Sequence, residues 1–320
     1  MEACSEKYCS LASLAAGEDP IGTATSAQLL LVLEVPLPWE REIWRSPGFP
    51  PGLFDLCAQH MTRLGLRVLC IAPDADYSRS DRRRLMILRR PAGPCAVYDR
   101  EEYLLPPDEL LPLVEALVGG ASPARFAPWR QAVEGARDLL VCTHGTVDVA
   151  CAKFGIPVYE QLRKRYAPVV PGLRVWRVSH FGGHRFAPTL IDLPDLRYWA
   201  HLDSQALDLL VHRKEPPSSL HRFYRGWGLL ASPFEQVLER EALEREGWEW
   251  LSYQKESRLL QAAEDGTSAR VSLSFRSPDG RQAGCYEAEV VVSHHVNTVM
   301  VSGKGPEPAP QYRITSLLRR

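Results

Sequence analysis

A pattern that occurs twice constrains the fold of this chain more than any other feature. Residues 65–68 (Gly-Leu-Arg-Val) reappear as residues 172–175, at an offset of 107 residues. In both places an apolar run continues, over 66–71 and 173–178, which is typical of a buried strand. The elements expected around the two runs follow the same order. We therefore expect an internal duplication, because self-similarity at a fixed offset indicates repeated structural units.

The first copy is expected to follow the order strand, helix, strand, hairpin, helix. The pattern predicts strands over 29–35 and 66–71, a helix over 53–64, a hairpin of 85–88 and 95–98, and a helix over 107–118. Gly65 is expected to end the first helix, because glycine readily adopts the left-handed conformation that closes a helix. The prolines and glycine of residues 91–94 are expected to form the hairpin turn.

The second copy is expected to repeat this order about a hundred residues later. It predicts strands over 138–142 and 173–178, a helix over 158–166 with Pro157 in its first turn, a hairpin of 188–193 and 196–200, and a helix ending at 212. Asp203 and Ser204 are expected to cap the last helix. A β-α-β unit followed by a hairpin and a helix is the plan of a thioredoxin-like domain.

The fold predicted from these patterns is α/β, with two tandem thioredoxin-like domains and a small α+β C-terminal appendage. The domains are expected at residues 1–130, 131–215 and 216–320. The appendage is predicted to hold a helix over 234–246 and strands over 248–253, 271–275, 286–292 and 298–301. Residues 1–26 are expected to be a loop in which Cys4 and Cys9 are free thiols.

Composition narrows the function classes. The net charge of −1 gives no reason to expect nucleic acid or an anionic membrane as a partner. No apolar run of about 18 residues exists and the N-terminus does not resemble a secretory signal, so we expect a cytoplasmic protein. Eight cysteines in 320 residues are too few for a disulfide scaffold. We find no nucleophile with a base, no dinucleotide loop and no phosphate loop, and therefore expect no catalytic residue.

Two thiols and two imidazoles stand out in the second copy. Cys142 and Cys151 have the spacing C-x8-C, and His180 and His184 have the spacing H-x3-H. Cys142 and His180 follow neighbouring strands at their carboxyl ends, where α/β sheets usually carry their sites. At the offset of 107 the first copy has Val35, Pro73 and Tyr77 in place of Cys142, His180 and His184. The pattern therefore predicts a metal centre in the second copy, with the first copy as a metal-free domain packed against it.

The residues alone leave the metal open. Structural zinc sites usually have thiols two to four residues apart, and the wider spacing of Cys142 and Cys151 favours a larger, two-metal centre over zinc. In a third interpretation, both cysteines are small buried hydrophobic residues and both histidines are surface residues.

The same stretch resembles the sucrase/ferredoxin-like family of thioredoxin-like ferredoxins, over about residues 18–250. The matching residues are Cys142, His144, Gly145, Asp148, Cys151, Phe154, Gly155, Pro157, Val158, Tyr159, His180, Gly182, Gly183, His184, Phe186, Ala187 and Pro188, with 20–24 and 224–226. The resemblance implies a 2Fe-2S cluster in which Cys142 and Cys151 hold one iron and His180 and His184 the other. It also implies an electron carrier, whose expected partners are a reductase and an acceptor protein. Exchange of two thiolates for imidazoles would raise the reduction potential and could couple proton release to oxidation.

Several neighbours of the four candidate ligands are expected to support them. Gly182 and Gly183 would let the backbone approach the cluster closely. His144 would either form a hydrogen bond to cluster sulfur or be an exposed loop residue, and Arg185 would screen the negative charge. Asp148 is expected either to cap the start of a helix, which is favoured, or to orient the loop.

Two further functions remain open at this stage. One is a zinc-stabilised binding module, and the other is an oxidoreductase that uses the cluster to reduce a small molecule or a thiol. Cys4 and Cys9 are the candidates for thiol exchange.

Overall fold

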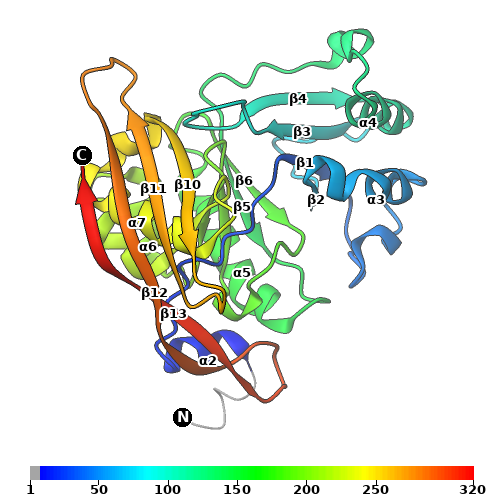
Figure 1. The fold of residues 1–320 in the computed structure, drawn as a ribbon. Coiled ribbons are helices and arrows are strands. Elements are labelled where there is room, and N and C mark those ends of the chain that lie inside the picture. Colours follow the sequence, from blue (N-terminus) through cyan, green and yellow to red (C-terminus); the bar gives the residue numbers. More distant parts are fainter. Residues whose placement is uncertain (1–7) are drawn as a thin grey trace.

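The structure, a computed structural model, describes residues 8–320 and contains two sheets (Figure 1). The strands of the large sheet are β1 (Leu29–Glu34), β2 (Leu66–Ile71), β3 (Arg83–Arg89), β4 (Asp99–Leu105), β5 (Arg137–Cys142), β6 (Leu173–Val178), β7 (Leu190–Leu193), β8 (Arg197–Trp199) and β9 (Tyr224–Trp227). Those of the small sheet are β10 (Gln254–Ala262), β11 (Ser268–Arg276), β12 (Ala283–Val299) and β13 (Pro306–Arg319). The α-helices are α2 (Cys9–Ala15), α3 (Leu53–Leu64), α4 (Leu110–Gly119), α5 (Val149–Gln161), α6 (Ser204–His212) and α7 (Pro233–Glu246). The fold is therefore mixed α/β, as predicted; Cys4 lies outside the described residues.

The nine-stranded sheet is built from two runs with the same strand order. Its order is β4-β3-β1-β2-β6-β5-β7-β8-β9. In the first run β1 pairs with β2 in parallel and with β3 antiparallel, and in the second run β5 pairs likewise with β6 and β7. The runs meet where β2 and β6 pair antiparallel through Ile71 and Val178. The two copies therefore share one sheet, while their thioredoxin-like character and the domain boundaries stay predictions.

Successive side chains of β1 point to opposite faces of the sheet, and one of these faces forms an apolar layer with the second copy. Leu29, Leu31 and Leu33 of β1 pack with residues of α3 and α4. Leu30 and Val32 face the other way and belong to the same core as Leu140 and Trp176 of the second copy. This two-faced burial explains why β1 is apolar at nearly every position.

Several boundaries agree with the predictions because local signals set them. Gly65 follows α3 with a φ of 52°, in the left-handed region. The Asp203 side chain accepts a hydrogen bond of 2.8 Å from the backbone N–H of Ala206 at the start of α6. Ser232 and Glu235 form a reciprocal capping box at the start of α7.

Other predicted elements were misplaced. The expected strand over 95–98 lies instead over Asp99–Leu105, and the expected strand over 248–253 is a 3₁₀ turn before β10. Pro157 lies inside α5, which the Asp148 cap starts at Val149, so the helix begins nine residues earlier than expected. The segment over 286–292 and the start of the segment over 298–301 belong to one long strand, β12, which ends at Val299.

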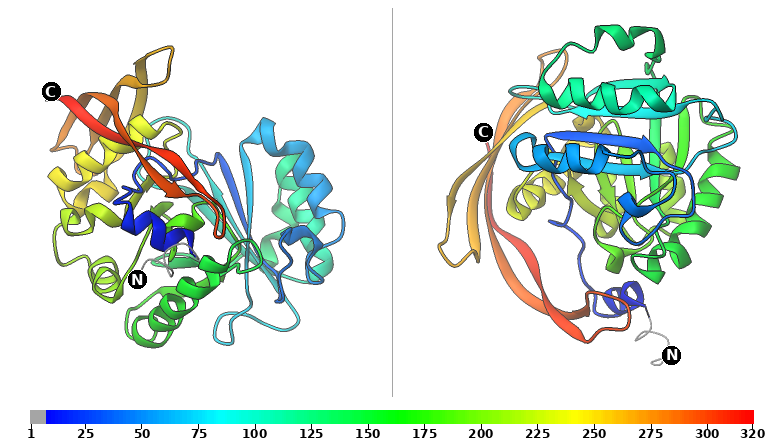
Figure 2. Two further views of the ribbon diagram at one scale, coloured as in Figure 1. Left: turned by 90° about the horizontal axis from the view of Figure 1, so that it is seen from below. Right: turned by 90° about the vertical axis from the view of Figure 1, so that its right-hand side faces the viewer.

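Two contacts of the C-terminal part with the rest of the chain bear on the site. β9, which was assigned to the appendage, is the last strand of the large sheet. The long β12–β13 hairpin extends past the other strands of the small sheet, and its tip lies beside α2 (Figures 1 and 2). There the Ser302 hydroxyl accepts a hydrogen bond of 3.1 Å from the backbone N–H of Cys9. The helix α2 and the strand β13 were not predicted.

A buried cluster of charges joins the two copies across their junction. Glu102 of β4 accepts hydrogen bonds from Arg100 at 2.9 Å and from Arg174 of β6 at 2.7 Å, and also from Arg84. Asp138 of β5 binds the same two guanidinium groups, Arg100 at 2.6 Å and Arg174 at 2.8 Å. Both carboxylates are fully buried. Each copy therefore supplies one carboxylate to a network that neither copy completes alone.

We expect Glu102→Gln to lower the free energy of unfolding by about 3–5 kcal/mol, because removal of one buried charge leaves its partners uncompensated. Urea unfolding followed by circular dichroism measures this. The control is Glu160→Gln, which removes an exposed pair with Lys164 at 3.0 Å and should cost no more than about 0.5 kcal/mol. Equal losses in the two variants would contradict a joining role for the network.

Candidate metal centre

Three of the four candidate ligands lie together at the carboxyl ends of β5 and β6. Cys142 is the last residue of β5, Cys151 is in the first turn of α5, and His180 follows β6. The Nδ1 atom of His180 lies 4.0 Å from Cys142 Sγ and 3.7 Å from Cys151 Sγ. Two thiols and an imidazole at these distances could hold a metal ion.

The two thiols of this group are electrostatically different. A hydrogen bond from the Cys151 thiol, together with one from His180, holds the pKa of Cys142 well below its usual value. The same hydrogen bond and burial raise the pKa of Cys151. Cys142 is thus the thiol that is prepared to be a thiolate, the form that binds metal.

His184 is the centre of a second group. Its Nδ1 atom lies 3.3 Å from a carboxylate oxygen of Asp148 and 3.4 Å from Cys9 Sγ. Cys9 Sγ lies 3.7 Å from the other oxygen of Asp148. This second set of a thiol, a carboxylate and an imidazole could also hold a metal ion.

The two groups adjoin through their imidazoles. The ring centres of His180 and His184 are 5.3 Å apart. The chain therefore brings the four predicted ligands to one place, but the side chains form two hydrogen-bonded groups, and the ligand set stays a prediction. Cys9 was expected in a loop, and the structure corrects this: it is the first residue of α2 and is fully buried.

The group of Cys142, Cys151 and His180 lies within the part of the chain that matches a known protein family, as does almost all of the large sheet. A sequence profile of sucrase/ferredoxin-like proteins matches residues 20–226, well over half of the chain. The chain belongs to the sucrase/ferredoxin-like family. No curated protein and no solved structure is detectably similar to it. The family region covers Cys142, Cys151, His180 and His184, whereas Cys9 and the β12–β13 hairpin lie outside it.

His144, inside the family motif, has a different role from either one expected. It is buried, with its Nε2 2.8 Å from the carbonyl oxygen of Glu40, and its Nδ1 accepts a hydrogen bond of 3.1 Å from the backbone N–H of His180. The Nε2–H therefore donates to Glu40, which leaves Nδ1 as the acceptor. His144 is thus neither exposed nor free to bind cluster sulfur, and it fixes the backbone at His180.

Gly182 and Gly183 form a tight turn between the two histidines, with φ values of 99° and 78°. A Cβ on Gly183 would lie 2.5 Å from a guanidinium nitrogen of Arg225. That guanidinium donates hydrogen bonds of 3.0 Å to the carbonyl of Gly182 and 2.7 Å to the carbonyl of Thr23. The second glycine is therefore required because a buried arginine packs against the turn.

Arg225 is a buried cation beside this turn, and the screening role expected of Arg185 stays a prediction. Arg185 pairs with Glu18 at 2.7 Å. Arg225 is almost completely buried and, among the described residues, forms no ion pair with a carboxylate. Burial lowers its pKa to about 10. The sequence motif contained Arg225, but nothing in it indicated that this side chain would reach the turn at Gly183.

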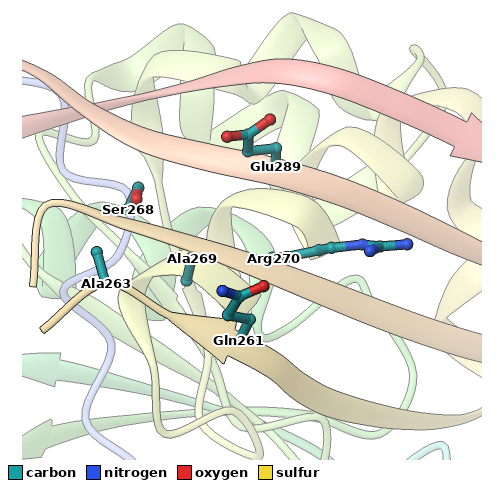
Figure 3. Close-up of a pocket in the computed structure, with 6 residues that line it drawn as sticks. All are labelled: Gln261, Ala263, Ser268, Ala269, Arg270 and Glu289. Carbon is teal, nitrogen blue, oxygen red and sulfur yellow. The ribbon is translucent and has the colours of Figure 1, made fainter.

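The hollow drawn in Figure 3 is lined by residues far along the sequence from the thiols and imidazoles of the two groups. It lies on the small sheet, has a volume of about 270 Å³ and is lined by Gln261, Ala263, Ser268, Ala269, Arg270 and Glu289. Its lining includes no thiol and no imidazole. The metal-type side chains lie instead at the carboxyl ends of β5 and β6, two inner strands of the large sheet.

We expect Gly183→Ala to reduce metal retention, because the new methyl group meets Arg225 at the turn that carries both histidines. Metal per chain after purification and desalting measures this. The control is Gly120→Ala, where φ is 76° but a Cβ would meet nothing within 4 Å. The control should cost about 1 kcal/mol of stability and keep its metal. Equal metal content in the two variants would contradict the steric argument.

Proposed function

We propose that the protein is an electron carrier with one 2Fe-2S cluster, held by Cys142, Cys151, His180 and His184 on a thioredoxin-like second copy. One observation carries the proposal: the two buried thiols lie within 4.0 Å of His180 Nδ1, and the ring of His184 adjoins that of His180. Membership of a ferredoxin-like family supports a redox role.

The chemistry of the donors fits such a cluster. When bound, a 2Fe-2S cluster accepts and releases one electron, and two neutral imidazoles in place of thiolates raise its potential. Cys142 supplies the thiolate that is already favoured, and the burial of both thiols excludes water from their side of the site. Arg225 supplies a buried positive charge without a carboxylate partner among residues 8–320. A charge of this kind favours the state with the extra electron.

The electron is proposed to enter and leave on the histidine side. His180 and His184 are partly exposed, whereas both thiols are buried. Val149 next to Asp148 is 52% exposed and Val301 next to Ser302 is 36% exposed. These apolar side chains offer a contact surface for the proposed partners, a reductase and an acceptor protein. No helix of the described residues is long and apolar enough to cross a membrane. A cytoplasmic location stays a proposal.

Metal analysis tests the function and separates it from the zinc alternative. Protein purified without oxygen should be red-brown, with iron and sulfide each at about two per chain, as a 2Fe-2S centre requires. Reduction should give an electron paramagnetic resonance signal of one unpaired electron per cluster. A colourless protein with one zinc per chain would show that the proposal is wrong.

Ligand variants test the assignment residue by residue. Cys142→Ala should lose the cluster, because a thiolate ligand disappears. His180→Cys and His184→Cys should each lower the reduction potential, since an anionic thiolate replaces a neutral imidazole. The control is Cys57→Ala, which removes a buried thiol from α3 in the first copy and should leave iron content unchanged. Unchanged potentials in both histidine variants would exclude them as ligands.

A further inference from the structure

The contacts that the two histidines make through Nδ1 leave different ring nitrogens available. His180 directs Nδ1 toward both thiols, at 4.0 Å and 3.7 Å. His184 directs Nδ1 away from them, toward Asp148 at 3.3 Å and Cys9 at 3.4 Å. On the proposed cluster, His180 is therefore poised to bind through Nδ1, and His184 has only Nε2 free.

Asp148 is held in place from three sides. The backbone N–H of Ala150 donates to it at 2.9 Å, and Ser302 donates from its backbone N–H at 3.0 Å and from its hydroxyl at 2.7 Å. The carboxylate side chain is almost completely buried. These three donors fix the carboxylate beside His184.

We infer that Asp148 is a positioning residue for His184: it accepts a hydrogen bond from Nδ1–H and so directs Nε2 to the metal. This rests on the proposed function. A metal-bound histidine commonly donates its other ring N–H to a carboxylate, which fixes its orientation and raises its basicity. Asp148 would do this for His184, and no carboxylate pairs with His180 among the described residues. The two imidazoles are therefore unequal ligands.

The segments that complete this arrangement come from the two ends of the described chain. Ser302 lies at the tip of the β12–β13 hairpin and Cys9 at the start of α2. Ser302 Oγ also lies 3.3 Å from Cys9 Sγ. Cys9 itself is a poor candidate for thiol exchange, because it is fully buried and burial raises its pKa to about 11. Its position indicates a supporting contact to His184.

Selective isotope labelling tests which nitrogen binds. Holoprotein containing histidine labelled with ¹⁵N only at Nδ1, or only at Nε2, is reduced and examined by electron–nuclear double resonance. Each label should give one strongly coupled nitrogen, Nδ1 from His180 and Nε2 from His184. Two coupled Nδ1 atoms would overturn this inference but leave the cluster proposal intact. A cluster without any coupled nitrogen would overturn the histidine ligation itself.

Two substitutions test the role of the Asp148 charge through the reduction potential. Asp148→Asn keeps a good helix-capping side chain but removes the negative charge, so His184 should donate less electron density and the potential should rise. Ser302→Ala removes a donor that draws charge from the carboxylate, so the potential should fall. The two variants should therefore shift the potential in opposite directions. A purely structural role of Asp148 and Ser302 would not produce opposite shifts.

The matched control is Asp203→Asn, which makes the same change at the cap of α6, where Asp203 binds Ala206. Its potential should equal that of the wild type. If both test variants leave the potential unchanged, or move it in the same direction, Asp148 does not position His184.

Discussion

The whole architecture depends on a short junction between two copies of one β-α-β pattern. β2 and β6 pair through one residue pair, Ile71 and Val178, so backbone hydrogen bonds alone hold the copies only weakly. Burial of the apolar layer between the copies supplies part of the remaining stabilisation of the junction. Glu102 and Asp138, one from each copy, share the guanidinium groups of Arg100 and Arg174. A displaced copy would leave these buried charges uncompensated, so the network selects one register for the junction.

The junction gives the copy without ligands a clear structural role. It brings the segment after β1 against the loop between Cys142 and Cys151. In that contact the carbonyl of Glu40 accepts from His144, the carbonyl of Trp39 accepts from Thr146 at 3.1 Å, and Arg41 donates to Val147 at 3.1 Å. His144 in turn holds the backbone of His180. The first copy thus fixes one wall of the candidate centre.

The sequence predicts best what local signals determine. The bounds of β2, β6, α3 and α6 follow from apolar runs, glycine and an Asp cap, and the predicted bounds agree with them. The repeat also predicts correctly that Cys142 and His180 meet at neighbouring strand ends, because topology fixes that contact.

Elements that depend on distant partners could not be predicted in this way. β13 carries Pro306, Pro308 and Pro310, which argue against a strand. It forms nevertheless, because it lies at the edge of its sheet and alternate residues of an edge strand need no partner for their N–H groups. The contact of Asp148 with Ser302 spans 154 residues and that of His184 with Cys9 spans 175, so neither has a local signal.

The residues of the candidate centre also divide into those placed by the repeat and those that come from distant segments. The residues proposed to bind the cluster lie inside the family region, on strand ends and loops whose positions follow from the repeat. Cys9, which contacts His184, and Ser302, which holds Asp148, come from segments outside that region. In the proposed centre the family region therefore supplies the metal-binding atoms, and the flanking segments contact one of the two imidazoles through Cys9. Because an imidazole that donates to a carboxylate is a stronger ligand, the flanking segments would act on the proposed redox centre through Asp148.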